Sequence, residues 1–331
     1  MEYTFFGNTG LEVSRLCLGC GGFSFSDEWG WTVADRERSV EVIDRAIDAG
    51  ITFIDTANVY SLGESEVLVG EAIQGRRDEL VIASKVGQAL EMRPNRRGLS
   101  RKHVLEQVEK SLDRLGTDYL DLYYAHQWDY RTPIKETLSA LDHLVDEGIV
   151  RYVGASNLAS WHLMKALKTS DAENYERFVA VQPEYSLLRR HEEENLLAVA
   201  ENQSLGVASY SPLAAGFLTG KYDRDDDRET LRAEDETWRD LGELASEDSW
   251  QVLDAVREIA DREGVTPVQL SVAWLLAKEV IDAPIIGPQT IEHLDEYLGS
   301  LDVSLTDEDV ERLEEPIDPS WSHSMIASEQ W

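Results

Sequence analysis

The stretch Tyr119-Leu120-Asp121-Leu122-Tyr123-Tyr124-Ala125 is a short and mostly apolar run that predicts a β-strand buried in a sheet. A stretch with apolar residues at helical spacing follows at 133–147, and a second apolar run follows at Val150–Ala155. A strand, a helix and another strand in this order are typical of a parallel sheet with helices packed on its faces. This part of the chain therefore indicates an α/β fold.

The same alternation extends in both directions along the 331 residues. The predicted strands are 16–18, 52–55, 80–85, 119–125, 150–155, 179–182, 206–210 and 283–286. The predicted helices are 35–49, 65–74, 100–115, 133–147, 159–169, 190–203, 250–263 with 266–278, and 290–298. Eight β/α units without a linker between them predict a (β/α)8 TIM barrel, as a single domain over residues 1–331. Residues 3–13, with a turn at 7–10, predict an N-terminal β-hairpin.

Residues that favour helix ends support these boundaries. Ser100 is suited to cap a helix N-terminus, and Thr132 precedes Pro133 at a first helical position. Four glycines fall just after predicted helices and are expected at C-caps: Gly50, Gly116, Gly148 and Gly206. The alternative fold, a doubly wound open sheet, needs a G-x-G-x-x-G turn, and 19–22 lacks the third glycine.

One connection is much longer than the others. It runs from Ser211 to Ser249, after the seventh strand, and is rich in Gly and acidic residues. A long loop in a compact domain usually folds over a ligand. We expect it at the C-terminal ends of the strands, where barrels keep their active sites.

The charge of the chain restricts its partners. Against 31 basic residues stand 64 acidic ones, which gives a net charge of -33. Such a charge repels nucleic acid and anionic membranes, so neither is an expected partner. A high-salt, halophilic cytoplasm fits best, because salt screens the self-repulsion, although an ordinary acidic protein is the alternative. The N-terminal residues 1–4 resemble no signal peptide, and a cytoplasmic location is predicted.

The pair Cys17 and Cys20 resembles half of a metal or redox motif, but the chain has no second cysteine pair. A strand at 16–18 would direct the two thiols to opposite faces, so they are expected in the core. The seven histidines include no H-x-H or H-E-x-x-H spacing, and no metal site is predicted.

Ionisable side chains lie at the ends of consecutive predicted strands. Asp55 ends the second strand and Tyr60 follows it, Lys85 ends the third, and His126 follows the fourth. A phenol, whose pKa is near ~10, exchanges protons poorly at neutral pH, but a neighbouring ammonium lowers that pKa. Asp55 would keep Lys85 charged, Lys85 would activate Tyr60, and His126 would orient a substrate oxygen.

Each of these residues has a structural explanation when taken alone. Asp55 and Lys85 could form a structural ion pair, Tyr60 could be a loop aromatic, and His126 could be a rim histidine. Their convergence on adjacent strand ends favours a catalytic site.

Six ordered motifs resemble the aldo-keto reductase family over essentially the whole chain. They are Asp55–Tyr60, Gly63–Glu66, Ala83–Val86, Asp118–His126, Gly148–Asn157 and Tyr210–Leu213. Residues 94–100 and 126–129 are similar to the branch that includes potassium-channel β-subunits and general-stress reductases.

The resemblance implies a barrel that binds NADP or NAD without a Rossmann motif and transfers hydride between the cofactor and a carbonyl or alcohol. Tyr60 is implied as general acid and base, tuned by Lys85 and Asp55, with His126 orienting the carbonyl. Ser156, Asn157 and Gln182 match residues that bind the nicotinamide amide, and Tyr210 matches the residue that stacks on its ring. The implied pyrophosphate loop contains Ser211, Pro212, Leu213, Gly216, Leu218 and Lys221. Further cofactor contacts are expected from Gly19, Cys20, Gly21, Asp55, Ile286, Gly287, Gln289, His293, Glu296 and Tyr297.

The segment 286–297 departs from the family. Gln289 replaces the usual Arg, Tyr297 replaces the usual Asn, and His293 is the only potential cation. An adenosine 2′-phosphate is normally met by Arg or Lys, so NAD use is as open as NADP use. Gly21 stands where the family often has a larger residue, which would enlarge the pocket.

Three tryptophans, Trp29, Trp31 and Trp128, fall on loops expected at the barrel mouth and could line a substrate pocket or pack beneath the loops. Trp161, Trp250 and Trp274 lie in predicted helices and are expected in the core. The expected partner is a small carbonyl or alcohol, and a homo-oligomer remains open. The alternative function is a cofactor-sensing regulatory subunit with little turnover.

Overall fold

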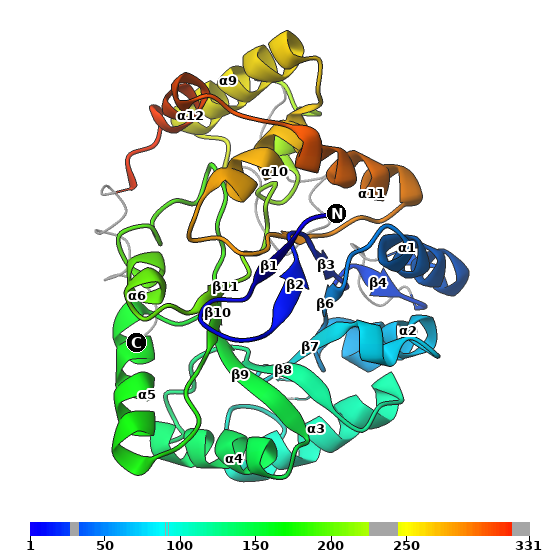
Figure 1. Ribbon diagram of the computed structural model, residues 1–331, viewed down its shortest axis with the longest axis vertical. Coiled ribbons are helices and arrows are strands. Elements are labelled where there is room, and N and C mark those ends of the chain that lie inside the picture. Colours follow the sequence, from blue (N-terminus) through cyan, green and yellow to red (C-terminus); the bar gives the residue numbers. More distant parts are fainter. Residues whose placement is uncertain (27–32, 90, 92, 225–243, 320–331) are drawn as a thin grey trace.

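Eight parallel strands form one sheet that curls into a barrel, with helices outside it (Figure 1). The computed structural model describes residues 1–26, 33–89, 91, 93–224 and 244–319. The strand order is β11-β10-β9-β8-β7-β6-β3-β12. These strands are β3 (Cys17–Gly19), β6 (Phe53–Asp55), β7 (Val81–Val86), β8 (Leu120–Ala125), β9 (Val150–Ser156), β10 (Ala180–Gln182), β11 (Gly206–Val207) and β12 (Ile285–Ile286). All eight predicted strands are present, and the predicted barrel is confirmed.

The ring closes between its first and last members by single hydrogen bonds rather than by a regular ladder. The amide of Asp282 donates to the carbonyl of Val207 at 3.1 Å, and the amide of Ile285 donates to the carbonyl of Ser209 at 2.8 Å. On its other side β12 pairs with β3, from the beginning of the chain. The seam therefore joins distant parts of the sequence.

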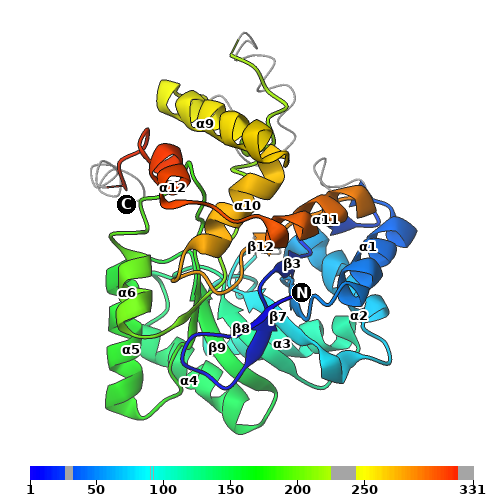
Figure 2. The same ribbon diagram turned by 45° about the horizontal axis from the view of Figure 1, so that its top comes forward.

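The helices cover the outer face of the barrel, as predicted (Figure 2). They are α1 (Arg36–Asp48), α2 (Glu64–Ala72), α3 (Arg101–Leu115), α4 (Ile134–Asp146), α5 (Ser160–Glu173), α6 (Leu196–Asn202), α9 (Glu247–Glu263), α10 (Pro267–Ala277) and α11 (Ile291–Leu298). A further helix, α12 (Asp307–Glu314), and the short strands β4 (Phe23–Ser24) and β5 (Val33–Ala34) were not predicted. Helix α12 lies beside α9 (Figure 2), where Arg262 contacts Asp309 at 2.6 Å.

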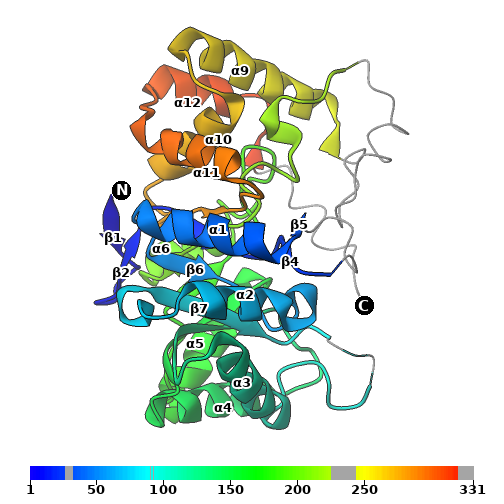
Figure 3. The same ribbon diagram turned by 90° about the vertical axis from the view of Figure 1, so that its right-hand side faces the viewer.

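The N-terminal hairpin forms as predicted and closes one end of the barrel. Strand β1 (Tyr3–Phe5) pairs antiparallel with β2 (Glu12–Ser14). Phe6 is fully buried and meets Phe53 of β6 edge to face, with 5.3 Å between ring centroids. Figure 3 shows the hairpin at one end of the molecule and β4 and β5 at the other. The hairpin thus fills the N-terminal ends of the strands and leaves their C-terminal ends to the site.

Buried side chains form an inner group within the barrel and an outer group between strands and helices. Phe6, Phe53 and Cys17 belong to the inner group. Cys20 belongs to the outer group, so the two free thiols lie buried on opposite faces, as predicted. Among the described residues, no cluster of three or more His, Cys, Asp or Glu side chains is arranged to hold a metal.

Most predicted helix ends are confirmed, and two are corrected. The hydroxyl of Ser100 accepts from the amide of His103, and Gly116 ends α3 in the left-handed region at φ 63°. Gly206 was expected as a C-cap, but it starts β11, because the left-handed residue after α6 is Ser204, at φ 54°. Helix α4 begins one residue later than expected, with Pro133 at its N-cap position.

None of the helices in the described ranges is both long enough and apolar enough to cross a membrane.

Candidate active site

The four predicted catalytic side chains meet at the C-terminal ends of neighbouring strands. Asp55 is the last residue of β6, Lys85 lies near the end of β7, and His126 follows β8 directly. Tyr60 follows β6 by one turn and begins the short 3-10 helix η1 (Tyr60–Gly63). Asp55, Lys85 and His126 are buried, at 3%, 0% and 5% exposure, and Tyr60 is partly buried.

Lys85 is the centre of the group. Its ammonium donates to the carboxylate of Asp55, to the hydroxyl oxygen of Tyr60 at 3.0 Å and to the carbonyl of Thr56 at 3.0 Å. An ammonium has three donors, and all three are used. The arrangement therefore suits a charged lysine and leaves the hydroxyl proton of Tyr60 free to point elsewhere.

Burial and charge act in opposite directions on the pair. Burial raises the pKa of Asp55 above its usual value, and the charge of Lys85 opposes that rise. Burial alone would lower the pKa of Lys85, but the charge of Asp55 and the hydrogen bonds to Asp55 and Tyr60 outweigh it and raise that pKa. Lys85 is thus protonated throughout the neutral range.

The sequence led us to expect a lowered pKa for Tyr60, and the structure corrects this. Burial raises the pKa of Tyr60, and Asp55 adds to the rise, so that the opposing effect of Lys85 is outweighed. A buried phenolate loses its hydration, and the nearby carboxylate repels it. Tyr60 is therefore held as a phenol.

His126 faces Tyr60 edge-on, with 5.8 Å between ring centroids and 85° between planes. Burial lowers the pKa of His126 far below its usual value, and the charge of Lys85 lowers it further. Its Nδ1 is buried and has no hydrogen-bond partner among the described residues. The ring is neutral, and one of its nitrogens can donate to a ligand oxygen.

The residues expected to bind the nicotinamide amide lie beside this group and are joined by hydrogen bonds. Gln182 donates to Asp55 at 2.8 Å, and Ser156 donates to the carbonyl of Gln182 at 2.8 Å. Asn157 donates to the carbonyl of His126 at 2.8 Å and accepts from the hydroxyl of Tyr210 at 2.8 Å. The structure thus places polar amide and hydroxyl groups at the ends of three strands next to the four predicted catalytic residues.

The loop after β11 has an unusual backbone. Ser211, Ala214 and Ala215 have φ values of 58°, 47° and 55°, and Gly216 follows at 87°. Left-handed residues in sequence cost energy unless the surroundings fix them, and such strain clusters at ligand sites. Leu213 and Leu218 anchor this segment in the core, and Lys221 is exposed. Residues 225–243 of the predicted long loop lie outside the described residues.

The other predicted cofactor residues lie on β3 and β12 and in the segments that follow these strands. A Cβ at Gly21 would lie 3.6 Å from the ring of Tyr60, so this backbone passes next to the phenol of Tyr60. Gly19 ends β3, and Cys20 follows it directly. Ile286 ends β12, and His293 and Tyr297 lie on α11, the first exposed and the second buried. Gly287, Gln289 and Glu296 complete this segment.

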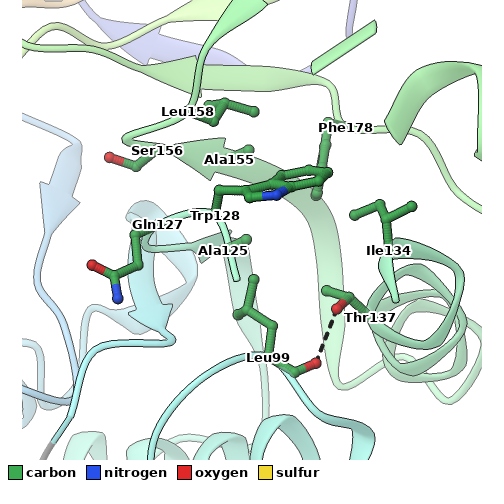
Figure 4. A pocket seen from close by; sticks show the side chains of 10 residues that line it. All are labelled: Leu99, Ala125, Gln127, Trp128, Ile134, Thr137, Ala155, Ser156, Leu158 and Phe178. Atoms are coloured by element: carbon green, nitrogen blue, oxygen red, sulfur yellow. Dashed lines mark hydrogen bonds between the residues drawn. The ribbon is translucent and has the colours of Figure 1, made fainter. Parts of the chain in front are cut away.

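Trp128 packs away from the barrel interior. Its ring stacks on His162 at 4.2 Å between centroids, and Figure 4 shows it directed toward Phe178 and Ile134, while Gln127 points the other way. The space beside it, between barrel and α4, is a cavity of about 10 Å³, which is room for about one water molecule.

Of the other tryptophans, Trp250 and Trp274 are buried as predicted. Trp161 was predicted in the core, and this was wrong, since it is 56% exposed. It lies at the start of α5 and covers the ring of His162 from outside. Trp29 and Trp31 lie outside the described residues.

Two contacts around the site were missed from the sequence. The carbonyl of Thr56 accepts a hydrogen bond from Lys85, and a backbone contact of this kind cannot be predicted from a side-chain motif. Gln107 of α3 binds Asn58 at 2.9 Å, although 49 positions separate them. The spacing of His103, Gln107 and Ser111 along one buried helix face was the available signal, since polar residues rarely recur there.

The chain resembles known proteins over nearly its whole length. Residues 17–318 match the Aldo/keto reductase family. An uncharacterized oxidoreductase, YrpG, from Bacillus subtilis is 38% identical over 93% of each chain. Versiconal hemiacetal acetate reductase from Aspergillus parasiticus is 33% identical over 98% of this chain and 99% of its own. A protein described as a probable voltage-gated potassium channel subunit beta, from Arabidopsis thaliana, is 32% identical over 92% of each chain. With its barrel, its resemblance and its motifs in agreement, the chain belongs to the aldo/keto reductase family of oxidoreductases.

Proposed function

We propose that this protein transfers hydride between a nicotinamide cofactor and the carbonyl of an aldehyde, ketone or sugar, or the corresponding alcohol, with Tyr60 as general acid and base. The contact that carries the proposal is the 3.0 Å hydrogen bond from the ammonium of Lys85 to the oxygen of Tyr60. Because Lys85 donates to that oxygen, the hydroxyl proton is free to reach a substrate. A proton donor held by a buried cation is what carbonyl reduction requires.

The residues beside the catalytic four fit a nicotinamide. Ser156, Asn157 and Gln182 offer amide and hydroxyl groups next to Asp55 and His126, and the ring of Tyr210 is held by its hydrogen bond to Asn157. The cofactor, when bound, supplies or accepts the hydride.

Each side chain then has a distinct task. In reduction Tyr60 gives its proton to the carbonyl oxygen, and Lys85 stabilises the phenolate that remains. Asp55 keeps Lys85 charged and in place. His126, which is neutral, donates a hydrogen bond that orients the carbonyl.

We further propose that the protein uses NAD as well as NADP. Residues 286–297 contain no Lys or Arg, and the nearby Arg45 of α1 is paired with Asp295 at 2.9 Å. An adenosine 2′-phosphate would thus meet His293 and several carboxylates rather than a guanidinium fork. Initial rates with both cofactors test this, and a preference of about a hundredfold for NADPH would contradict it.

The expected partner is a small molecule that carries a carbonyl or hydroxyl group, and the expected location is the cytoplasm. A cofactor-sensing regulatory subunit remains the second candidate function, because the relatives include a channel subunit beta. It predicts cofactor binding without turnover on any carbonyl compound.

The central test is Tyr60→Phe, which removes the hydroxyl and little volume. We expect kcat to fall by about 10²- to 10⁴-fold, while cofactor binding, followed by fluorescence, is retained. Tyr130→Phe is the matched control, because Tyr130 is 72% exposed and should leave kcat unchanged. A panel of aldehydes, ketones, sugars and alcohols should be screened with both cofactors in molar salt. Full turnover by Tyr60→Phe would refute the mechanism.

A further inference from the structure

Backbone hydrogen bonds join the segment that carries Tyr60 to β7. The amide of Thr56 donates to the carbonyl of Ala83 at 2.9 Å, and the amide of Asn58 donates to the carbonyl of Lys85 at 3.3 Å. Asn58 lies between the two catalytic residues of this segment, Asp55 and Tyr60. Its position therefore helps to set the distance between Tyr60 and Lys85.

The side chain of Asn58 is anchored from another direction. Its Nδ2 donates to Oε1 of Gln107, on α3, at 2.9 Å, and both side chains have 0% exposure. Within the described residues, Asn58 Oδ1 and Gln107 Nε2 have no hydrogen-bond partner. Among the described residues, Gln107 is thus the one hydrogen-bond partner of the Asn58 side chain. Without Gln107, the buried amide of Asn58 would have no partner.

Helix α3 gives this tie a rigid base. The helix spans Arg101–Leu115, begins at the Ser100 cap and ends at Gly116. It buries Val104 and Val108 on the side that also carries Gln107. A side chain on a long, capped helix positions a partner more accurately than one on a loop does.

We propose that Gln107 is a positioning residue for the reaction. Through Asn58 it holds the segment 56–59, and so it fixes the Tyr60 hydroxyl at Lys85. In the described part of the chain, Gln107 forms a hydrogen bond with Asn58 and none with Tyr60 or Lys85, so its effect passes through Asn58. The inference rests on the proposed function of Tyr60.

Loss of the hydrogen bond between Gln107 and Asn58 should affect kcat and not cofactor binding. Loss of the tie would let the Tyr60 hydroxyl move relative to Lys85 and to a substrate carbonyl, and small misplacements are costly in kcat. The expected cofactor residues Ser156, Asn157 and Gln182 lie on β9 and β10 or next to β9, and Tyr210 follows β11. In the sheet, β8 separates these strands from β7, the strand that α3 contacts. A defect in positioning should therefore lower kcat and leave the KM for the cofactor nearly unchanged.

The experiment shortens one amide and then restores the pair. Gln107→Asn keeps the chemical group but withdraws it by one methylene, and we expect kcat to fall by about tenfold with the cofactor KM within about twofold. The double variant Asn58→Gln with Gln107→Asn returns the missing methylene from the other side and should regain most of kcat. Ser111→Ala is the matched control, since its hydroxyl is buried on the same helix with no partner in the described part of the chain, and kcat should not change.

Each outcome decides something. Unchanged kcat in Gln107→Asn overturns the inference, and so does a double variant that is no better than the single one. If Gln107→Asn does not fold, a folded and active double variant supports the tie, and a double variant that is folded but as inactive as Tyr60→Phe overturns it. Full activity of Tyr60→Phe would defeat the proposed function instead, whatever Gln107 does.

Discussion

Two opposing effects act on the pKa of Tyr60, and their balance sets the pH range in which Tyr60 can donate its proton. Burial and Asp55 favour the phenol, while Lys85, at 3.0 Å, favours the phenolate. Burial has the larger effect, so Tyr60 keeps its proton at neutral pH. When the proton is lost, Lys85 still stabilises the phenolate. A general acid for reduction needs both properties.

We predict that reduction is independent of pH from about pH 6 to about pH 9. The raised pKa of Tyr60 places the alkaline loss of activity above the ordinary phenol value, because only the protonated form donates. The lowered pKa of His126 removes an acidic limb near its usual value, since the ring is already neutral. Profiles of kcat/KM in a single mixed buffer measure both limbs. A limb near pH 6.5 that vanishes in His126→Gln would contradict the assignment.

The sequence predicted the positions of Asp55, Lys85 and His126, because strand periodicity alone places them at one end of a barrel. The direction in which the pKa of Tyr60 shifts could not be predicted from strand periodicity. It depends on how many atoms surround the phenol, and those atoms come from elements distant in sequence.

The N-terminal hairpin and β11 pack against each other at very short distances. A Cβ on Gly206 would lie 2.8 Å from the ring of Phe6, and a Cβ on Gly7 would lie 2.2 Å from the amide nitrogen of Gly206. The hairpin therefore lies so close to β11 that neither Gly7 nor Gly206 has room for a side chain. The sequence predicted the hairpin from its turn, but the helix-end interpretation of Gly206 failed, because such proximity is invisible until the chain is folded.

We predict that Gly206→Ala lowers the free energy of unfolding by about 1–3 kcal/mol, because the new methyl group must displace the buried ring of Phe6. Urea denaturation would measure the change. Gly10→Ala serves as the control, because a Cβ there meets nothing within 4 Å, and a change within about 0.5 kcal/mol is expected. Equal stability of Gly206→Ala and the unaltered protein would show that the hairpin is not held by this contact.

For the whole molecule, the net charge of -33 is the dominant electrostatic property. Surface ion pairs such as Arg45 with Asp295 contribute little at any salt concentration, because both partners are exposed. Repulsion among the excess carboxylates is the larger effect, and dissolved ions screen it.

We therefore predict that the melting temperature rises between dilute buffer and about 2 M KCl, with most of the rise complete below roughly 0.5 M, where the screening length has already become short. Differential scanning calorimetry measures it. Sucrose, which is excluded from protein surfaces but carries no charge, is the control. The idea of a halophilic protein fails if the melting temperature is the same in both salt conditions.

The seam of the barrel has a consequence for how the chain becomes a protein on the ribosome. Strand β12 lies between β3, which precedes it by more than 200 residues in the sequence, and β11, which it meets through Asp282 and Ile285. A nascent chain that ends before these residues carries two unpaired strand edges. The ring therefore stays open until residues 282–286 have been translated.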